Sequence, residues 1–287
     1  MTNLWNPRLP GVETAFQLVN KDGHKYEYSG EPWVPNMVES HIQGVAPYSK
    51  FLVMTHNNKG YSKGYILVID TDTGKLVCKM DSPDADYNHP GGCQTIGDFL
   101  VVAVENSSYS ESFTHFIQPD SAERRQGPTV LPCNIKRPYQ GAGGAGISNF
   151  TQDGVEYYIL AVYDNGKPLT DLEISFSLVH QACTKDGFSE VCLLTQEDGQ
   201  IFLAGFRSSG SAYEDWADLY LYDPIPLTLE CVASRHRYTK HGGVVGISGV
   251  HFRWGAGLGI VNGTQLNFFA TQRNFVGGHT YTNTFRP

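Results

Sequence analysis

The stretch that decides the fold is NHPGGCQTIGDFLVVAVEN, residues 88–106. A histidine opens it, a Gly-Asp turn divides it, and an almost continuous apolar run carries it to Glu105. Phrases of the same kind open at His41, at the glycine-rich QGAGGAGISNF from Gln140, at His180 and at His241. The starts are separated by 48, 51, 40 and 61 residues, so a unit of about 50 residues recurs along the chain.

Each unit contains a short apolar segment, a turn and a stronger apolar segment, and most units continue with a third and a weaker fourth segment. Short β-branched and aromatic runs bounded by Gly, Asn, Asp and Pro predict strands, and helical periodicity is nearly absent. Four strands in about 50 residues are typical of a propeller blade. The sequence therefore predicts an all-β fold, a five-bladed β-propeller that forms a single domain over residues 1–287, with blades starting near 41, 89, 140, 180 and 241.

The last unit lacks an obvious fourth strand before the chain ends in TFRP. The segment ETAFQLVNKDGHKYEYSG at residues 13–30 is expected to supply it, so that the two chain ends close the ring and hide an exposed sheet edge. The alternative is a β-sandwich or a pair of small β domains, neither of which needs a repeat.

Composition restricts the partners. The formal net charge of -8 and the absence of a Lys/Arg-rich stretch argue against nucleic acid and anionic membranes as partners. No apolar run approaches the roughly 20 residues of a membrane span, and the N-terminus lacks the pattern of a secretory signal. Six cysteines without a CxxC pair favour reduced, mostly buried thiols. We expect a cytoplasmic monomer that acts on a small molecule.

Propeller topology places the starts of first strands and the ends of second strands around one mouth of the central axis. The starts bring four histidines to this mouth, His41, His89, His180 and His241. The ends of second strands add further candidates for catalysis, Glu105, Asp164 and Arg207. Polar and aromatic residues expected to bind substrate there are His56, Asn57, Asn106, Asn165, Trp254 and Asn262. Such a convergent polar cavity is where ligands and catalysis are expected.

Three interpretations of the histidine ring remain open. Repeated histidines beside glycines can bond to backbone carbonyls and fix the blades, as the Gly-His pair does in WD-type repeats. Imidazoles that converge on one point can also bind a divalent metal ion. At the level of arrangement the four axial histidines resemble those of the carotenoid oxygenase propellers, which bind iron, and this resemblance implies a metal at the axis. Without a metal, histidine is a natural general acid or base near neutral pH.

The opening NPRLPG, residues 6–11, resembles the start of some five-bladed glycosidases, but VETAF follows where their sequence leads to a catalytic Asp. A glycosidase would need two placed carboxyl groups, for which Glu105 and Asp164 are candidates. We therefore expect an enzyme of the lyase, cyclase or hydrolase type that acts on a small organic molecule at the axial histidines. The alternative is a non-catalytic propeller that binds a ligand or glycan, in which the histidines are architectural.

Overall fold

The computed structural model describes residues 7–30, 41–58, 62–118, 129–164, 187–209, 214–223, 228–240 and 249–287, and the backbone of four short strands between 169 and 182. These parts are almost entirely β-structure, with one short helix, α1 (Val12–Leu18). No helix in the described ranges is long and apolar enough to cross a membrane.

The strands form antiparallel sheets in chain order. One sheet contains β2 (Ile42–Tyr48), β3 (Phe51–Asn57), β4 (Gly64–Asp70) and β5 (Lys75–Asp81). The next contains β6 (His89–Ile96), β7 (Phe99–Glu105), β8 (Glu111–Gln118) and β9 (Thr129–Pro138). Then follow the pair β10 (Gly144–Gln152) and β11 (Val155–Tyr163), and a sheet of β16 (Glu190–Thr195), β17 (Ile201–Ser209), β18 (Glu214–Asp223) and β19 (Thr228–Arg237).

The two chain ends share the last sheet. It contains β20 (Val250–Val261), β21 (Gln265–Gln272), β22 (His279–Phe285) and β1 (His24–Ser29), and β1 runs antiparallel to β22 with Tyr26 opposite Thr282. This is the closure that the sequence predicted for the N-terminal segment. The first part of that segment differs from the expectation, because it forms α1, whose apolar face packs between β19 and β21.

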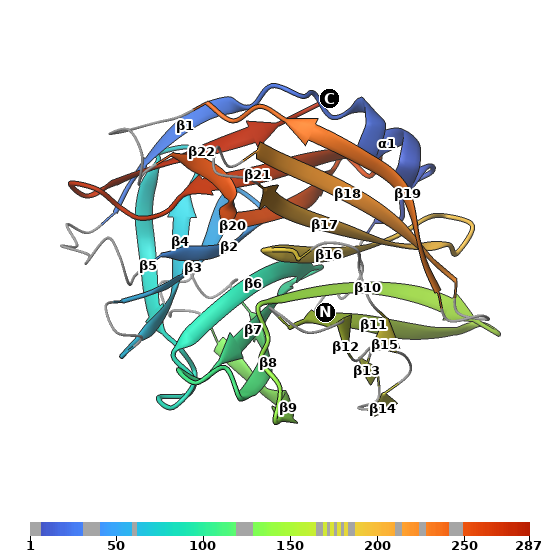
Figure 1. The fold of residues 1–287 in the computed structure, drawn as a ribbon, viewed down its shortest axis with the longest axis horizontal. Helices are drawn as coiled ribbons and strands as arrows, with labels where there is room; N and C mark the ends of the chain where they lie inside the picture. Colours follow the sequence, from blue (N-terminus) through green and yellow to red (C-terminus); the bar gives the residue numbers. More distant parts are fainter. Residues whose placement is uncertain are drawn as a thin grey trace.

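The first strands surround a common centre. β2, β6, β10, β16 and β20 contact one another in that order, and β20 contacts β2 again. In Figure 1 these strands lie toward the middle, whereas the last strands β5, β9 and β19 lie toward the outside. Antiparallel sheets arranged in this way form a β-propeller.

Two neighbouring sheets are more closely joined than separate blades would be. A parallel pairing of Gly44 with Ala256 and another of Ser29 with Lys75 connect them into a closed sheet of eight strands. Glycine allows this approach, since a Cβ on Gly257 would collide with the carbonyl oxygen of Val45.

Some described first strands begin after the expected blade starts. The first strands of the fourth and fifth sheets begin at Glu190 and Val250, and the expected starts were near 180 and 241. The third begins at Gly144, slightly after the expected 140. Between 169 and 182 the described backbone forms two short strand pairs, β13 (Glu173–Ile174) with β14 (Ser177–Leu178), and β12 (Leu169–Thr170) with β15 (Gln181–Ala182).

Apolar clusters fill the spaces between neighbouring sheets. Val68 packs with Val104 between the first two sheets, for example, and Val101 packs with Ile147 between the next two. Strands β3 and β7 are buried along their whole length, which explains their unbroken apolar runs. β5 alternates between more and less exposed residues, as expected of an outer strand.

Polar side chains tie the first strands together at the centre. The buried Gln94 amide donates to Leu193 O at 2.8 Å and accepts the N–H groups of Ile147 and Leu193. The buried Glu190 carboxyl accepts the N–H of Cys93 at 2.8 Å. Burial raises the pKa of Glu190 well above its usual range. These hydrogen bonds join the first strands of three neighbouring sheets, β6, β10 and β16.

Candidate functional site

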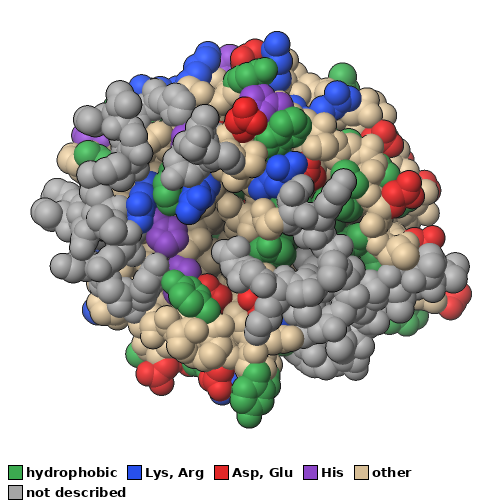
Figure 2. Space-filling model, in the orientation of Figure 1, with side chains coloured by type: hydrophobic (Ala, Val, Ile, Leu, Met, Phe, Trp, Pro, Cys, Tyr) green, Lys and Arg blue, Asp and Glu red, His purple; other side chains and the backbone are tan. Residues whose placement is uncertain are grey.

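A cavity of about 580 Å³ opens where first strands begin and second strands end. Its polar and aromatic lining residues come from all five sheets and their loops: His41, Gln43, His89, Glu105, Tyr109, Asp164, Phe188, Ser189, Ser208, Arg253, Trp254 and Arg273. Figure 2 shows histidine and basic side chains together around a hollow near the middle of one face. We call this space the histidine cavity.

His89 and Glu105 form a buried pair in this cavity. They are cross-strand partners in β6 and β7, and Nδ1 of His89 donates to Oε1 of Glu105 over 2.7 Å. The second oxygen of Glu105 accepts the Ala142 N–H at 2.8 Å. Both carboxylate oxygens are therefore engaged, and the bond at Nδ1 leaves Nε2 of His89 to face the cavity.

His41 lies beside this pair. The rings of His41 and His89 have centroids 5.5 Å apart, and the Gln43 side-chain nitrogen lies between their Nε2 atoms, in contact with both. Burial, then the positive charges of His89 and Arg273, holds the pKa of His41 well below its usual range. His41 is therefore neutral at neutral pH. An amide nitrogen has two hydrogens, so Gln43 can donate to both imidazoles when both are neutral.

Two arginines flank a tryptophan on another wall of the histidine cavity. The guanidinium carbons of Arg253 and Arg273 lie 5.4 and 4.7 Å from the centroid of the Trp254 ring, within cation–π range. The Arg253 backbone N–H donates to Ser208 Oγ at 2.9 Å, which anchors this wall to the neighbouring sheet. The two guanidiniums give the wall a positive charge that suits an anionic group.

A second carboxylate faces Glu105 across the backbone of Gly141. A Cβ on Gly141 would lie 2.6 Å from Oε2 of Glu105 and 3.3 Å from Oδ1 of Asp164, so the two carboxyl groups are near neighbours. Tyr109 joins them, with its ring 5.3 Å from that of His89. The absence of a side chain at Gly141 lets both carboxyl groups approach its backbone.

The structure thus brings together His41, His89, Glu105, Asp164 and Trp254 from the predicted set. The predicted catalytic residue Arg207 does not line the histidine cavity, because its Nε donates to Asp218 at 2.6 Å. Arg253 and Arg273 supply the positive charge of the cavity instead.

Four residues predicted to bind substrate also lie elsewhere. His56 is buried against Asn274, and Asn57 accepts the His41 backbone N–H at 2.9 Å and so supports the cavity indirectly. The Asn106 side chain accepts the Ser110 N–H and closes a turn. Asn262 lies in the turn after β20, at the opposite end of the axis, because β20 is the first strand of its sheet and not the second.

His180, His241 and Asn165 lie outside the described residues. Within the described ranges no group of three or more His, Cys, Asp and Glu side chains could hold a metal ion. Of the predicted ligands, His41 and His89 are described and adjacent, and the nearby Arg253 and Arg273 oppose a cation by charge repulsion.

Sequence reasoning missed Gln43, Tyr109, Arg253 and Arg273. The rule that second strands end at the cavity would have found Arg273, which directly follows β21, had LNFFATQ been recognised as a second strand. Sequence reasoning also missed His251, at the start of β20. Nδ1 of His251 lies 2.9 Å from Oδ2 of Asp215. That buried pair connects two sheets, so this histidine is architectural.

No protein-family model matches the sequence, and no curated protein matches it. Solved structures match over most of its length. A hypothetical protein from Leishmania major is 10% identical with a TM-score of 0.50, over 96% of this chain and 93% of that one. The catalytic domain of the GH62 α-L-arabinofuranosidase of Coprinopsis cinerea is 8% identical with a TM-score of 0.49, over 91% and 96%. The WD40 domain of Toxoplasma gondii coronin is 13% identical with a TM-score of 0.38, over 93% and 76%. The likeness to the Leishmania major protein concerns the fold alone. The TM-scores of the other two structures are too low to support any statement about this chain.

Proposed function

We propose that this protein is a five-bladed β-propeller enzyme that performs acid–base chemistry on a small organic molecule in the histidine cavity. The blade count is supported by the closed order of contacts among β2, β6, β10, β16 and β20. Five apolar clusters, each between adjacent sheets, give the same number. The cytoplasmic location and the monomeric state stay predictions from the sequence.

The observation that carries the proposal is the His89–Glu105 pair. A buried carboxylate that accepts from Nδ1 fixes the tautomer of an imidazole and stabilises its charged form after it takes a proton. When substrate displaces the Gln43 amide that contacts it, Nε2 of His89 accepts a proton from the substrate and later returns it. His41, which is neutral, contributes a second hydrogen-bonding nitrogen beside it.

The two arginines of the cavity wall can stabilise the negative charge that proton transfer leaves on the substrate. Proton abstraction from carbon or from an attacking hydroxyl leaves negative charge on the substrate, and cations placed beforehand stabilise that charge. Arg253 and Arg273 occupy one wall of the same cavity as the His89–Glu105 pair. These two residues, in place of the predicted Arg207, therefore stabilise the negative charge on the substrate. Elimination and hydrolysis both fit this arrangement.

A second candidate function is ligand binding without catalysis. One observation favours it: His251, at the start of β20, pairs with Asp215 of the neighbouring sheet and has no place in the cavity. Histidines at blade starts can therefore serve the architecture of this chain. His89 differs from His251, because it lines a cavity and its carboxylate comes from the adjacent strand of its own sheet.

The test combines a substrate screen with paired variants. Hydrolysis of para-nitrophenyl esters and glycosides, and elimination from small β-hydroxy acids, are assayed with the wild type, His89→Gln and Glu105→Gln. We expect turnover of one class to fall about 100-fold or more in both variants, the usual contribution of a general acid–base group. Arg207→Gln is the matched control, because that side chain pairs with Asp218 outside the cavity.

Melting temperatures and metal content are measured on the same samples. Turnover that survives in His89→Gln would overturn the proposal, and so would a loss of turnover that only follows a loss of folded protein. Binding of a panel compound without turnover, weakened in His89→Gln, would establish the ligand-binding alternative. Zinc or iron that copurifies with the wild type and is lost in both His41→Ala and His89→Ala would show that the predicted metal ion binds at this site.

A further inference from the structure

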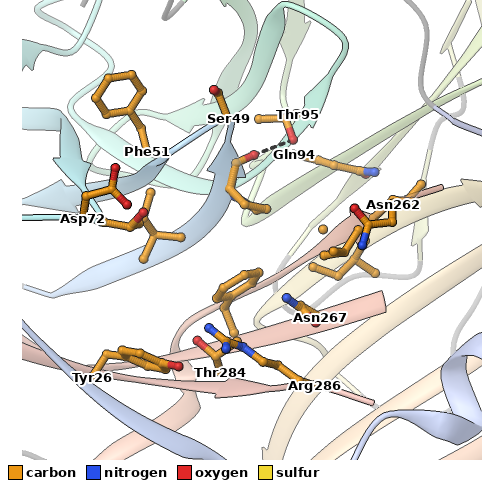
Figure 3. Close-up of a pocket in the computed structure, with 18 of the residues that line it drawn as sticks. Tyr26, Ser49, Phe51, Asp72, Gln94, Thr95, Asn262, Asn267, Thr284 and Arg286 are labelled. Atoms are coloured by element: carbon orange, nitrogen blue, oxygen red, sulfur yellow. Dashed lines mark hydrogen bonds between the residues drawn. The ribbon is translucent and has the colours of Figure 1, made fainter. Parts of the chain in front are cut away.

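A second cavity, of about 640 Å³, opens at the opposite end of the axis. It lies between the sheet that carries β2 and β3 and the sheet that carries β1 and β20–β22. Figure 3 shows its side chains around a common space, Ser49 and Asp72 from turns of one sheet, and Tyr26, Asn267 and Arg286 from the other. None of the described residues that line it lines the histidine cavity. We call it the distal cavity.

Aromatic rings form much of the wall of the distal cavity. Tyr26 and Tyr28 come from β1, Phe51 from β3 and Phe269 from β21. The guanidinium carbon of Arg286 lies 5.3 Å from the centroid of the Tyr26 ring, which places this cation at the edge of the aromatic wall. Rings at a cavity wall provide flat apolar surface against which the C–H groups of a ligand can pack.

The polar groups of the cavity select the kind of ligand. Arg286 can only donate hydrogen bonds, and the Asp72 carboxylate can only accept them. The side chains of Asn262, Asn267 and Thr284 can do both. A ligand carboxylate only accepts and an ammonium only donates, so either would suit one part of the lining and oppose another. Hydroxyl groups donate and accept, and neighbouring hydroxyls match both a guanidinium and a carboxylate.

The charges of the distal cavity and of the whole chain also favour a neutral ligand. Among the described residues that line the distal cavity there is one cation and one carboxylate, and the whole chain carries a formal charge of -8, so an anion gains little there. The volume lies within the range of about 300–1,000 Å³ that small-ligand cavities occupy. We infer that the distal cavity is a binding site for a neutral carbohydrate, separate from the histidine cavity. It does not depend on the proposed acid–base function.

Saturation-transfer NMR titrations test this inference. The ligands are neutral sugars (glucose, galactose, mannose, xylose, arabinose, maltose, cellobiose and lactose) and two charged relatives, gluconate and glucosamine. At least one neutral sugar is expected to bind saturably and more tightly than both charged compounds. Its Kd should rise about ten-fold in Tyr26→Ala and in Asn267→Ala, as expected for the loss of a ring contact or of one or two hydrogen bonds.

Two controls locate the site. Tyr157→Ala removes a half-exposed tyrosine of β11 that lines neither cavity, and His89→Gln alters the histidine cavity. Both should leave the Kd within about two-fold of the wild type. Tyr26 packs beside the core whereas Asn267 is partly exposed, so Asn267→Ala remains decisive if Tyr26→Ala fails to fold.

Three results would overturn the inference. No neutral sugar saturates the protein, or gluconate or glucosamine binds more tightly than every neutral sugar. In the third case a sugar binds, but Asn267→Ala leaves its Kd unchanged while His89→Gln weakens it, which places the sugar in the histidine cavity. Sugar binding at the distal cavity together with absent turnover would reject the acid–base proposal and leave this inference intact.

Discussion

Glu105 accepts a hydrogen bond from Nδ1 of His89 over 2.7 Å and, with its other oxygen, the backbone N–H of Ala142 over 2.8 Å. The first bond joins adjacent strands of one sheet, and the second reaches the segment that leads into β10. One buried carboxylate therefore orients the imidazole of the histidine cavity and also ties two sheets together.

Removal of this carboxylate should reduce stability. Glu105→Ala leaves the Ala142 N–H and the His89 Nδ1–H without their acceptor, at a cost of about 2–4 kcal/mol in the free energy of unfolding. Urea unfolding measures the change. Glu197→Ala, in the exposed turn after β16, is the control and should cost less than about 0.5 kcal/mol. Equal losses in the two variants would show that the paired carboxylate has no special structural role.

Stability should fall as the pH falls below the usual pKa of histidine. Burial lowers the pKa of His56 from 6.5 to about 4, so the folded protein holds this ring neutral while the unfolded chain takes up a proton. The stability due to His56 is complete above pH 6.5 and is lost progressively as the pH falls toward 4. At pH 5 the loss is about 2 kcal/mol.

The matched variant for this prediction is His56→Gln, whose amide can still donate to Asn274. Urea unfolding at pH 7 and pH 5 should show a pH-dependent loss that is about 2 kcal/mol smaller in the variant than in the wild type. If the two proteins lose the same amount, protonation of His56 does not drive the acid sensitivity.

The two arginines of the histidine cavity should lower the pKa of His41. The positive charge of Arg273, and to a lesser extent that of Arg253, contributes to the low pKa of this imidazole. Arg273→Gln is therefore expected to raise the pKa of His41, and Arg253→Gln to raise it less. NMR titration of nitrogen-15-labelled histidine follows the ring directly. A larger rise in Arg253→Gln than in Arg273→Gln would contradict the arrangement of charges in this cavity.

Gly257 should tolerate no side chain. A Cβ at this position would collide with the carbonyl oxygen of Val45, where β20 approaches β2, and backbone atoms on both strands cannot move aside cheaply. Gly257→Ala should destabilise the fold by about 3 kcal/mol or more, as overpacking at buried sites does. Gly11→Ala is the control, because its Cβ would make only ordinary contacts with Thr14. Thermal unfolding compares the two, and similar melting temperatures would refute the predicted close approach.

Part of the candidate site followed directly from the repeat. His41 and His89 are far apart in the chain, but both stand where a first strand begins, and the structure places their rings 5.5 Å apart. The same rule applied to the ends of second strands placed Glu105 and Asp164 in the cavity. It misplaced Asn262, because the apolar residues before it, 258–261, end the long first strand β20 and not a second strand. Apolar runs alone do not tell first strands from second strands.

Other features depended on individual side-chain partners. Arg207 and Arg253 lie on neighbouring sheets, but Arg207 pairs with Asp218 of the adjacent strand, and Ser208 accepts the backbone N–H of Arg253. Neither contact has a sequence signature, because the first depends on the register of β17 against β18 and the second on how β17 packs against β20.

The alternation of strands and turns determined the β-structure, the common mouth for His41 and His89 and the use of the N-terminus to complete the last sheet, because these depend on local periodicity and chain order. The tertiary structure alone decided which charged groups meet, and it revealed that the histidine cavity and the distal cavity are separate. Side-chain partners and cavity walls depend on how neighbouring sheets pack, and that packing brings together residues that no local pattern relates.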